Sequence, residues 1–158
     1  MILSIDPGTT ESAFVLWDHG IKDKGKIDND KLLIYIKNCS CYKTTVAIEM
    51  VASYGMAVGK CVFETVRWIG RFQQAAIHEN FDTVLIYRKD IKMHHCHSMQ
   101  AKDSNIRQAI IDRYGGKNKA IGLKKTPGPL YGISKDVWSA LAILLFFLDT
   151  RKSNNAIS

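Results

Sequence analysis

Two carboxylates lie where the apolar pattern predicts burial. Asp6 ends the apolar run of residues 1–6, and Glu49 interrupts the β-branched run of residues 44–51. A buried carboxylate is costly unless it is paired, hydrogen-bonded or bound to a metal. Two of them on neighbouring strands would repel each other, and a divalent cation between them would remove that repulsion. Oxygen ligands without His or Cys favour Mg²⁺ or Mn²⁺. The alternative remains open that Asp6 only forms the turn before Pro7-Gly8 and Glu49 only pairs with a lysine or the backbone.

A third acid, Asp136, precedes an apolar stretch of helical spacing. Ser134 can cap a helix that runs to about Thr150, with Asp136 in its first turn, where a carboxylate suits the helix dipole. That dipole role is the simple interpretation. Helical spacing also places Asp136 on one face with Ser139 and Ala140, ahead of an apolar docking surface. Three acids that converge there would form a site for metal-assisted phosphodiester hydrolysis, in which one ion activates water and a second stabilises the leaving oxygen.

The positive charge of the chain is confined to one window. The formal net charge is +7, and residues 88–135 hold 11 basic and 3 acidic side chains. A charge run of this kind is either a solvated surface or a surface for phosphates. The remaining sequence is close to neutral, so a polyanionic partner would contact this window.

These residues need a scaffold, and the pattern predicts a mixed α/β sheet with helices on both faces. Strands are predicted at residues 1–6, 12–17, 44–51 and 83–87, with a third strand possible near the N-terminus. Helices are predicted at residues 30–37, 57–79, 101–114 and from Ser134 to about Thr150. Residues 115–132 are predicted to be a loop. We expect a single domain over residues 1–152 and a frayed tail at residues 153–158.

Composition narrows the class of protein. The chain has 158 residues, of which 46% are hydrophobic and 23% charged, so it is neither disordered nor collagen-like. Its four cysteines have no disulfide-like spacing, and we see no signal peptide, which predicts an intracellular, cytoplasmic protein. The longest apolar run, residues 140–148, is too short to cross a membrane.

Five strings in order carry a family resemblance: LSIDPGTTESAFVLWD, VAIEMVASYGMAVGK followed by VFETVRWIGRF, AKDSNIRQAIIDRYGG, PGPLYG and DVWSALAILLFFLD. Together they resemble the RuvC-type Holliday junction resolvases, most closely the short forms of phages and prophages. The resemblance covers nearly the whole chain. It implies an RNase H-like fold with a five-stranded mixed sheet, and a homodimer that places two active sites on a four-way DNA junction. The implied activity is that of a crossover junction endodeoxyribonuclease in phage or bacterial recombination, with two Mg²⁺ or Mn²⁺ ions in each site.

Carried over to this sequence, the family's catalytic and metal-binding acids match Asp6, Glu49 and Asp136. The last helix of the family carries a second metal-binding position three residues on, and here that residue is Ser139. Serine is a poor metal ligand, so one metal site would be weaker or would be completed by water and the DNA phosphate. This departure leaves a second hypothesis open, a junction- or branched-DNA-binding protein that cuts poorly or not at all.

The same resemblance suggests contacts with DNA. The basic residues that would contact its backbone without reading bases are Lys89, Lys92, Lys102, Arg107, Lys117, Lys119, Lys124 and Lys125. Lys102, at the start of a predicted helix, would also help to hold the scissile phosphate. Tyr54 would stack on an unpaired base at the junction centre, or is simply a surface tyrosine.

Other sequence features have simpler interpretations. Lys60, Glu64, Arg67 and Arg71 form either a salt-bridge ladder or phosphate contacts. We do not expect a structural zinc at residues 94–97, because adjacent residues on a strand or loop point in different directions. Trp17, Trp68 and Trp138 are predicted core residues. The string DPGTT is similar to the phosphate loop of actin-like ATPases, but those enzymes need two lobes and this chain has the length of one.

Overall fold

A five-stranded mixed sheet forms the centre of the computed structural model, which describes residues 1–39, 43–53, 55 and 57–155. The strand order is β3-β2-β1-β4-β5. The first three strands are antiparallel, and β4 and β5 run parallel to β1. The bounds are β1 Ile2–Asp6, β2 Glu11–Trp17, β3 Ile21–Asp28, β4 Thr45–Met50 and β5 Asp82–Tyr87.

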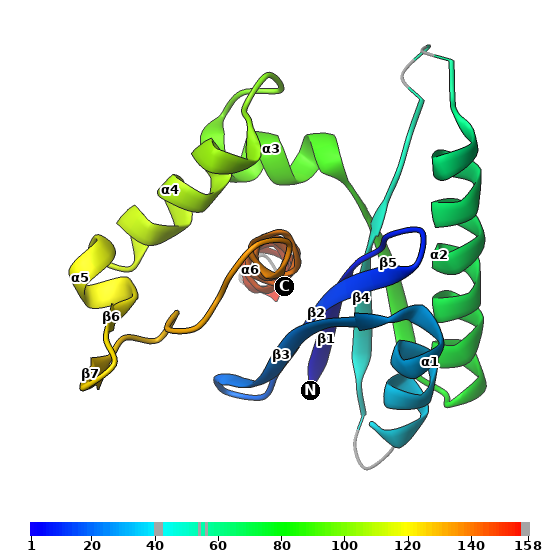
Figure 1. Ribbon diagram of the computed structural model, residues 1–158, viewed down its shortest axis with the longest axis horizontal. Helices are drawn as coiled ribbons and strands as arrows, with labels where there is room; N and C mark the ends of the chain where they lie inside the picture. The colour runs from blue at the N-terminus through cyan, green and yellow to red at the C-terminus, as the bar shows by residue number, and fades with distance from the viewer. Residues whose placement is uncertain (40–42, 54, 56, 156–158) are drawn as a thin grey trace.

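Helices cover both faces of this sheet (Figure 1). Helices α1 (Asn29–Asn38) and α2 (Lys60–His78) pack on one face, and α6 (Val137–Asn155) packs on the other against β1, β2 and β4. Beyond α6 lie α3 (Arg88–Cys96), α4 (Asp103–Arg113) and α5 (Lys117–Ala120). A short hairpin of β6 (Gly122–Leu123) and β7 (Thr126–Pro127) follows α5. The predicted mixed five-stranded sheet with helices on both faces is therefore confirmed.

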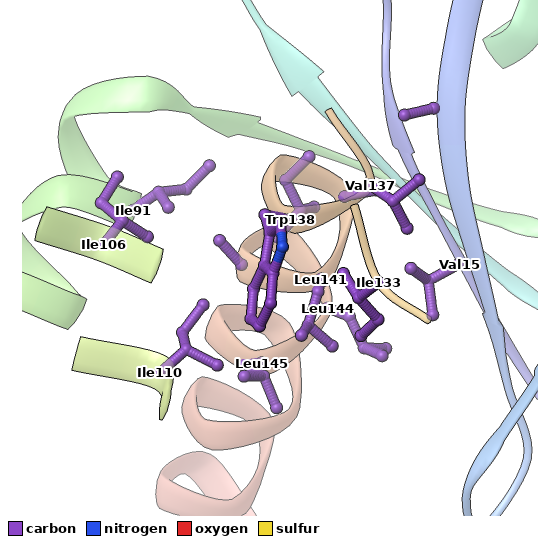
Figure 2. Packing of buried hydrophobic residues seen from close by; sticks show 14 of the residues in the cluster. Val15, Ile91, Ile106, Ile110, Ile133, Val137, Trp138, Leu141, Leu144 and Leu145 are labelled. Carbon is purple, nitrogen blue, oxygen red and sulfur yellow. The ribbon is translucent and has the colours of Figure 1, made fainter. Parts of the chain in front are cut away.

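Alternation along the strands divides the core into two clusters. On β1, Leu3 and Ile5 pack towards α1 and α2. Ser4 lies on the opposite face, where its Oγ donates to the backbone oxygen of Ala140 on α6 at 2.8 Å. Because successive strand residues point to opposite faces, Asp6 shares the α6 face with Ser4. Figure 2 shows the apolar packing around α6, including Trp138 and the isoleucines of α4.

The predicted strands and helices are largely confirmed, with three differences. The strand β3 was not assigned bounds, because an exposed edge strand reading IKDKGKID has no apolar alternation. Helix α3 was missed, and the predicted loop at residues 115–132 contains α5 and the hairpin. Helix α6 begins at Val137 and continues to Asn155, beyond the predicted end near Thr150; residues 156–158 lie outside the described part, and the frayed tail stays a prediction.

The long helix α2 buries less of its predicted apolar face than expected. Ile69, Phe72 and Ala76 are buried, but Val58, just before the helix, and Val66 on it are each 38% exposed. Of the three tryptophans, Trp138 is buried, whereas Trp17 and Trp68 are partly buried against the two clusters. Within the described residues, no helix is long and apolar enough to span a bilayer.

Candidate active site

The turn after β1 fixes the position of Asp6. Gly8 N donates to Ser12 Oγ at 3.1 Å, and Asn29 Nδ2 donates to the Gly8 oxygen at 3.0 Å. Ser12 Oγ in turn donates to Asn29 Oδ1 at 2.6 Å, and both of these side chains are buried. A Cβ on residue 8 would lie 2.3 Å from the Glu11 oxygen, so only glycine fits this turn. The string after Asp6 is therefore a rigid connection that holds the carboxylate at the end of the strand.

Glu49 lies beside Asp6 on the neighbouring parallel strand. The register pairs Ile5 with Ile48, which places the two acids at the next step of both strands and on the α6 face. Glu49 is only 7% exposed. Burial, and then the charge of Glu49, raise the pKa of Asp6 to about 7. Burial also raises the pKa of Glu49, against the opposing charge of Arg88. The site therefore contains a buried carboxylate, Glu49, and a partly buried one, Asp6, and the two repel each other.

Asp136 approaches this pair from the start of α6, and its charge adds to the rise in the pKa of Asp6. Its backbone oxygen accepts from Ser139 N at 2.9 Å, so Asp136 lies just before the first turn of the helix, not within it as predicted. The carboxylate is 52% exposed and accepts a hydrogen bond from Lys26 Nζ on β3 at 2.7 Å. Lys26 was not predicted, because its strand was not recognised.

Ser139, the departure from the family pattern, is part of the same site. Its hydroxyl lies close enough to Asp6 to lower the pKa of that carboxyl, against the larger effect of burial. A neutral hydroxyl thus occupies the position where the family pattern has an ionisable ligand. It stabilises the ionised Asp6 without adding a further negative charge.

Arg88 is the main site residue that the sequence did not identify. Its Nη1 donates to Glu49 Oε2 at 2.9 Å, and its Nη2 donates to Asp103 Oδ1. Arg88 is the first residue of α3, directly after β5, and β5 runs parallel to β4. A signal was present in the sequence: parallel neighbouring strands end at the same edge of a sheet, so a residue that follows one strand can reach a residue at the end of the next.

The donor set suits a hard divalent cation, although it is not arranged as a finished metal site. In the described part of the chain, no three His, Cys, Asp or Glu side chains are grouped closely enough to hold an ion. Arg88 and Lys26 are instead the counterions of Glu49 and Asp136. No ion pair among the described residues involves Asp6, whose raised pKa marks a missing positive charge. Asp6 and Glu49 could hold Mg²⁺ or Mn²⁺ with Asp136 close by, and this assignment stays a prediction.

A cavity of about 560 Å³ lies between α4 and α6, and Asp136, Ser139 and Arg88 are among the residues that line it. Of the predicted DNA-binding residues, Arg107 and Lys117 line it, and Lys135 lines it as well, although it was not predicted. The Arg107 guanidinium lies over the Trp138 ring, 5.0 Å from its centroid. The cavity therefore has basic side chains on one side and the acids Asp103 and Asp136 on its wall.

The other predicted DNA-binding residues are spread over the same side of the chain. Lys92 is partly buried, donates to the Met99 oxygen at 3.5 Å, and its charge lowers the pKa of Glu49. Lys102 is exposed directly before α4, and Lys89 lies 5.9 Å from the Tyr87 ring. The exposed lysines of α5 and the hairpin are Lys119, Lys124 and Lys125. Tyr54 lies outside the described residues.

The remaining motifs have structural partners. Residues 94–96 lie on α3, not on a strand or loop as supposed, and His94 Nε2 lies 2.8 Å from Asp149 Oδ2 on α6. Arg113 donates to both oxygens of the same Asp149. The network thus ties α3 and α4 to α6.

On α2, Lys60 and Glu64 form an ion pair at 3.6 Å, which supports the ladder interpretation for this pair. Arg71 instead pairs with Asp30 on α1 and lies over the Trp68 ring.

Solved structures with the same architecture include RuvC. The Thermus thermophilus RuvC structure superposes with a TM-score of 0.65 at 14% sequence identity, covering 97% of this chain and 96% of that chain. T. thermophilus RuvC in complex with Holliday junction substrate gives a TM-score of 0.61 at 14% identity, with 92% and 90% covered. No protein-family model matches the sequence, and no curated protein matches it. At this identity the similarity establishes the fold, which confirms the predicted RNase H-like architecture.

Proposed function

We propose that this protein is a metal-dependent endonuclease that resolves four-way DNA junctions by phosphodiester hydrolysis. One observation carries the proposal: the partly buried Asp6 and the buried Glu49 lie side by side on the central strands of a RuvC-like fold, facing the start of α6. Buried like-charged groups cost stability unless they serve a ligand or a reaction. The proposed setting is recombination or repair of phage or bacterial DNA in the cytoplasm of the host cell.

The three acids form one metal-binding set in this proposal. Asp6 and Glu49 hold Mg²⁺ or Mn²⁺, and Asp136, at the exposed rim, completes the set from α6. Bound there, a pair of such ions would activate the attacking water and stabilise the leaving oxygen. The Ser139 hydroxyl favours the ionised form of Asp6, which is the form that binds a cation. The rigid turn at Gly8 prevents Asp6 from moving away from Glu49 as the substrate enters.

The basic surface would hold DNA against these acids. Arg107, Lys117 and Lys135 line the same cavity as Asp136, and a phosphate bound there would meet these positive charges. Lys124 and Lys125 extend the positive surface along the hairpin. Contacts to phosphates position a duplex without reading its sequence, which suits an enzyme that recognises the shape of a junction. A homodimer would place two such sites on one junction.

A synthetic four-way junction tests the proposal directly. We expect symmetrical nicks near the branch point with Mg²⁺ or Mn²⁺, and no cleavage with EDTA. A linear duplex with the same arm sequences is the control for junction specificity. Cleavage of the duplex at the same rate would contradict junction specificity, and unchanged cleavage in EDTA would contradict metal dependence.

A second candidate function is junction binding with little or no cleavage. It is favoured by the neutral hydroxyl of Ser139 beside Asp6, at a position where a further ionisable ligand would bind metal better. The same experiment separates the two functions. Tight binding of the junction without nicks, at any Mg²⁺ or Mn²⁺ concentration tested, would favour the binding protein.

A further inference from the structure

Two acids of the site, Asp136 and Glu49, are each paired with a basic side chain of the same chain, and the two ion pairs differ in exposure. Lys26 meets Asp136 at the surface, where both side chains are well exposed, at 40% and 52%. Arg88 meets Glu49 in a more enclosed place, with side-chain exposures of 26% and 10%. Water screens the first pair and screens the second much less. The Arg88–Glu49 pair is therefore the stronger electrostatic element of the site.

Arg88 is also shared between two acids. One guanidinium nitrogen donates to Glu49, and the other donates to Asp103, whose side chain is 71% exposed at the start of α4. Both Arg88 and Asp103 line the 560 Å³ cavity. Arg88 therefore has a partner that would remain if Glu49 were taken by another cation, and that partner faces the cavity where a DNA phosphate would lie.

We propose that Arg88 is the counter-cation of Glu49 in the metal-free protein, and that a divalent ion must displace it. Once displaced, Arg88 stays on Asp103 and turns its free guanidinium nitrogen to a phosphate of the bound DNA. Arg88 is thus a positioning residue whose partner changes from Glu49 to a phosphate of the substrate. The DNA half of this proposal rests on the proposed function, whereas the metal half does not.

The physical basis is competition for one carboxylate. Arg88 Nη1 lies 2.9 Å from a Glu49 oxygen, and a metal ion bound to the same carboxylate would be repelled by the guanidinium charge. The displaced guanidinium would be costly if it were left without an acceptor, which Asp103 prevents. Metal binding and DNA binding would then assist each other. The metal ion displaces Arg88 from Glu49 and so frees it for a phosphate, and a phosphate that takes Arg88 leaves Glu49 free for the metal ion.

Mn²⁺ binding to the protein alone, without DNA, tests the first half. We would follow it by electron paramagnetic resonance under nitrogen at pH 8.5, where protons compete less for the carboxylates. Arg88→Gln is expected to bind Mn²⁺ about tenfold more tightly than the unmodified protein, since the competing charge is gone. Arg151→Gln, which removes an exposed guanidinium near the C-terminal end of α6, is expected to stay within about twofold. Unchanged or weaker binding by folded Arg88→Gln overturns the proposal.

Two further variants keep the test decisive. If Arg88→Gln does not fold, Arg88→Lys retains the charge but not the two-sided fork, and tighter Mn²⁺ binding by about threefold is expected. Asp103→Asn should weaken Mn²⁺ binding more when Arg88 is present than in the Arg88→Gln background. Only with Arg88 present is there a displaced guanidinium that Asp103 must hold. Equal weakening in both backgrounds would contradict the role of Asp103.

Junction binding tests the second half. With Ca²⁺ as a non-cleaving ion, Arg88→Gln should weaken binding of a four-way junction by about fivefold, and by less than about twofold in EDTA, where Arg88 is held by Glu49. Equal losses in both conditions would overturn the exchange. Failure of the unmodified protein to bind any junction would contradict the proposed function, and the Mn²⁺ result would still stand.

Discussion

The two faces of the central sheet are made by the same strands and behave in opposite ways. Towards α1 and α2, β1 and β4 present Leu3, Ile5, Val46 and Ile48, all fully buried in an apolar cluster. Towards α6, the residues in between are Ser4, Asp6, Ala47 and Glu49. The alternation of a strand thus lets one backbone serve a stabilising core and a reactive surface at once.

The difference between the faces is electrostatic. Both faces carry an apolar cluster whose burial stabilises the sheet. The α6 face also contains carboxylates whose pKa values are raised by burial, and the pKa of Asp6 is raised further by the charge of Glu49. The apolar packing holds the sheet together, and this stability allows the α6 face to keep groups that repel each other until a cation arrives. The predictions below separate these two roles.

Asp6→Asn should give the largest effect, a loss of junction cleavage by about a thousandfold or more, because a metal-binding carboxylate is removed. Junction binding should be retained, since Asp6 makes no phosphate contact in our proposal. Single-turnover cleavage and gel-shift binding measure the two effects. Asp18→Asn, an exposed acid in the β2–β3 turn, is the matched control and should cut normally. Normal cutting by Asp6→Asn would refute the metal assignment.

Ile48 precedes Glu49 on β4 and points to the α1/α2 face. Ile48→Ala should lower the free energy of unfolding by about 3 kcal/mol. Ile48 is fully buried, so the loss comes from apolar burial and from the cavity left behind. Ile34→Ala, at a position 60% exposed on α1, should change stability by less than about 0.5 kcal/mol. Urea denaturation measures both. A parallel loss of Mn²⁺ affinity in folded Ile48→Ala would show that the faces are not independent.

The stability of the metal-free protein should fall as pH rises from about 4 to about 7. Folding raises the pKa of Asp6 from 3.8 to about 7, so in this range the folded state holds a proton that the unfolded state has lost. We expect a decrease on the order of 2 kcal/mol, because partial exposure of the site reduces the full effect of the shift. Above pH 7 the decrease should level off.

Asp6→Asn is the control for this pH dependence, since it removes the titrating group. The difference between its unfolding free energy and that of the unmodified protein should grow between pH 4 and pH 7. Mg²⁺ should stabilise the unmodified protein more at pH 8 than at pH 5, because protons compete with the ion at the lower pH. Parallel stability curves would show that Asp6 is not the group responsible.

Ser139→Asp restores an acid next to Asp6 and should lower the metal-free stability at pH 8 by about 1 kcal/mol, through like-charge repulsion. Saturating Mn²⁺ should recover that loss, and Mn²⁺ should bind more tightly. Ser134→Asp adds the same charge at an exposed position before α6 and should do neither. Thermal unfolding with and without Mn²⁺ measures the effect. Equal responses from the two variants would place Ser139 outside the metal site.

The smallest effect is expected from Lys124→Ala combined with Lys125→Ala, on the exposed hairpin. Junction affinity should fall a few-fold, and the slope of its logarithm against the logarithm of salt concentration should decrease by up to about 2, as fewer counterions are released. Metal binding should not change. An unchanged salt slope would place the DNA surface elsewhere, and cleavage at a fixed occupancy of DNA should remain normal.

Much of the site could be predicted because its acids interrupt strong patterns. Asp6 and Glu49 stand out in apolar strands, and Asp136 stands out at the start of the last helix. Arg88 and Lys26 could not be found in this way, since each lies in a polar segment without a periodic signal. Their importance depends on pairing between strands that are distant in sequence: Lys26 reaches Asp136, 110 residues away, and Arg88 reaches Glu49, 39 residues away.

The sequence by itself determined the alternation of the strands, the acids that interrupt them and the basic window, because these are local properties of residue type and spacing. Only the tertiary structure decided which cation faces which acid, and that the Ser139 hydroxyl lies beside Asp6. Pairing of this kind depends on strand order and helix docking, which local patterns do not encode. For the same reason the basic residues of 88–135, which give this window a net charge of +8, do not form one uniform surface. Arg88 lies among the acids, Arg107 and Lys117 line the cavity, and the hairpin lysines are exposed.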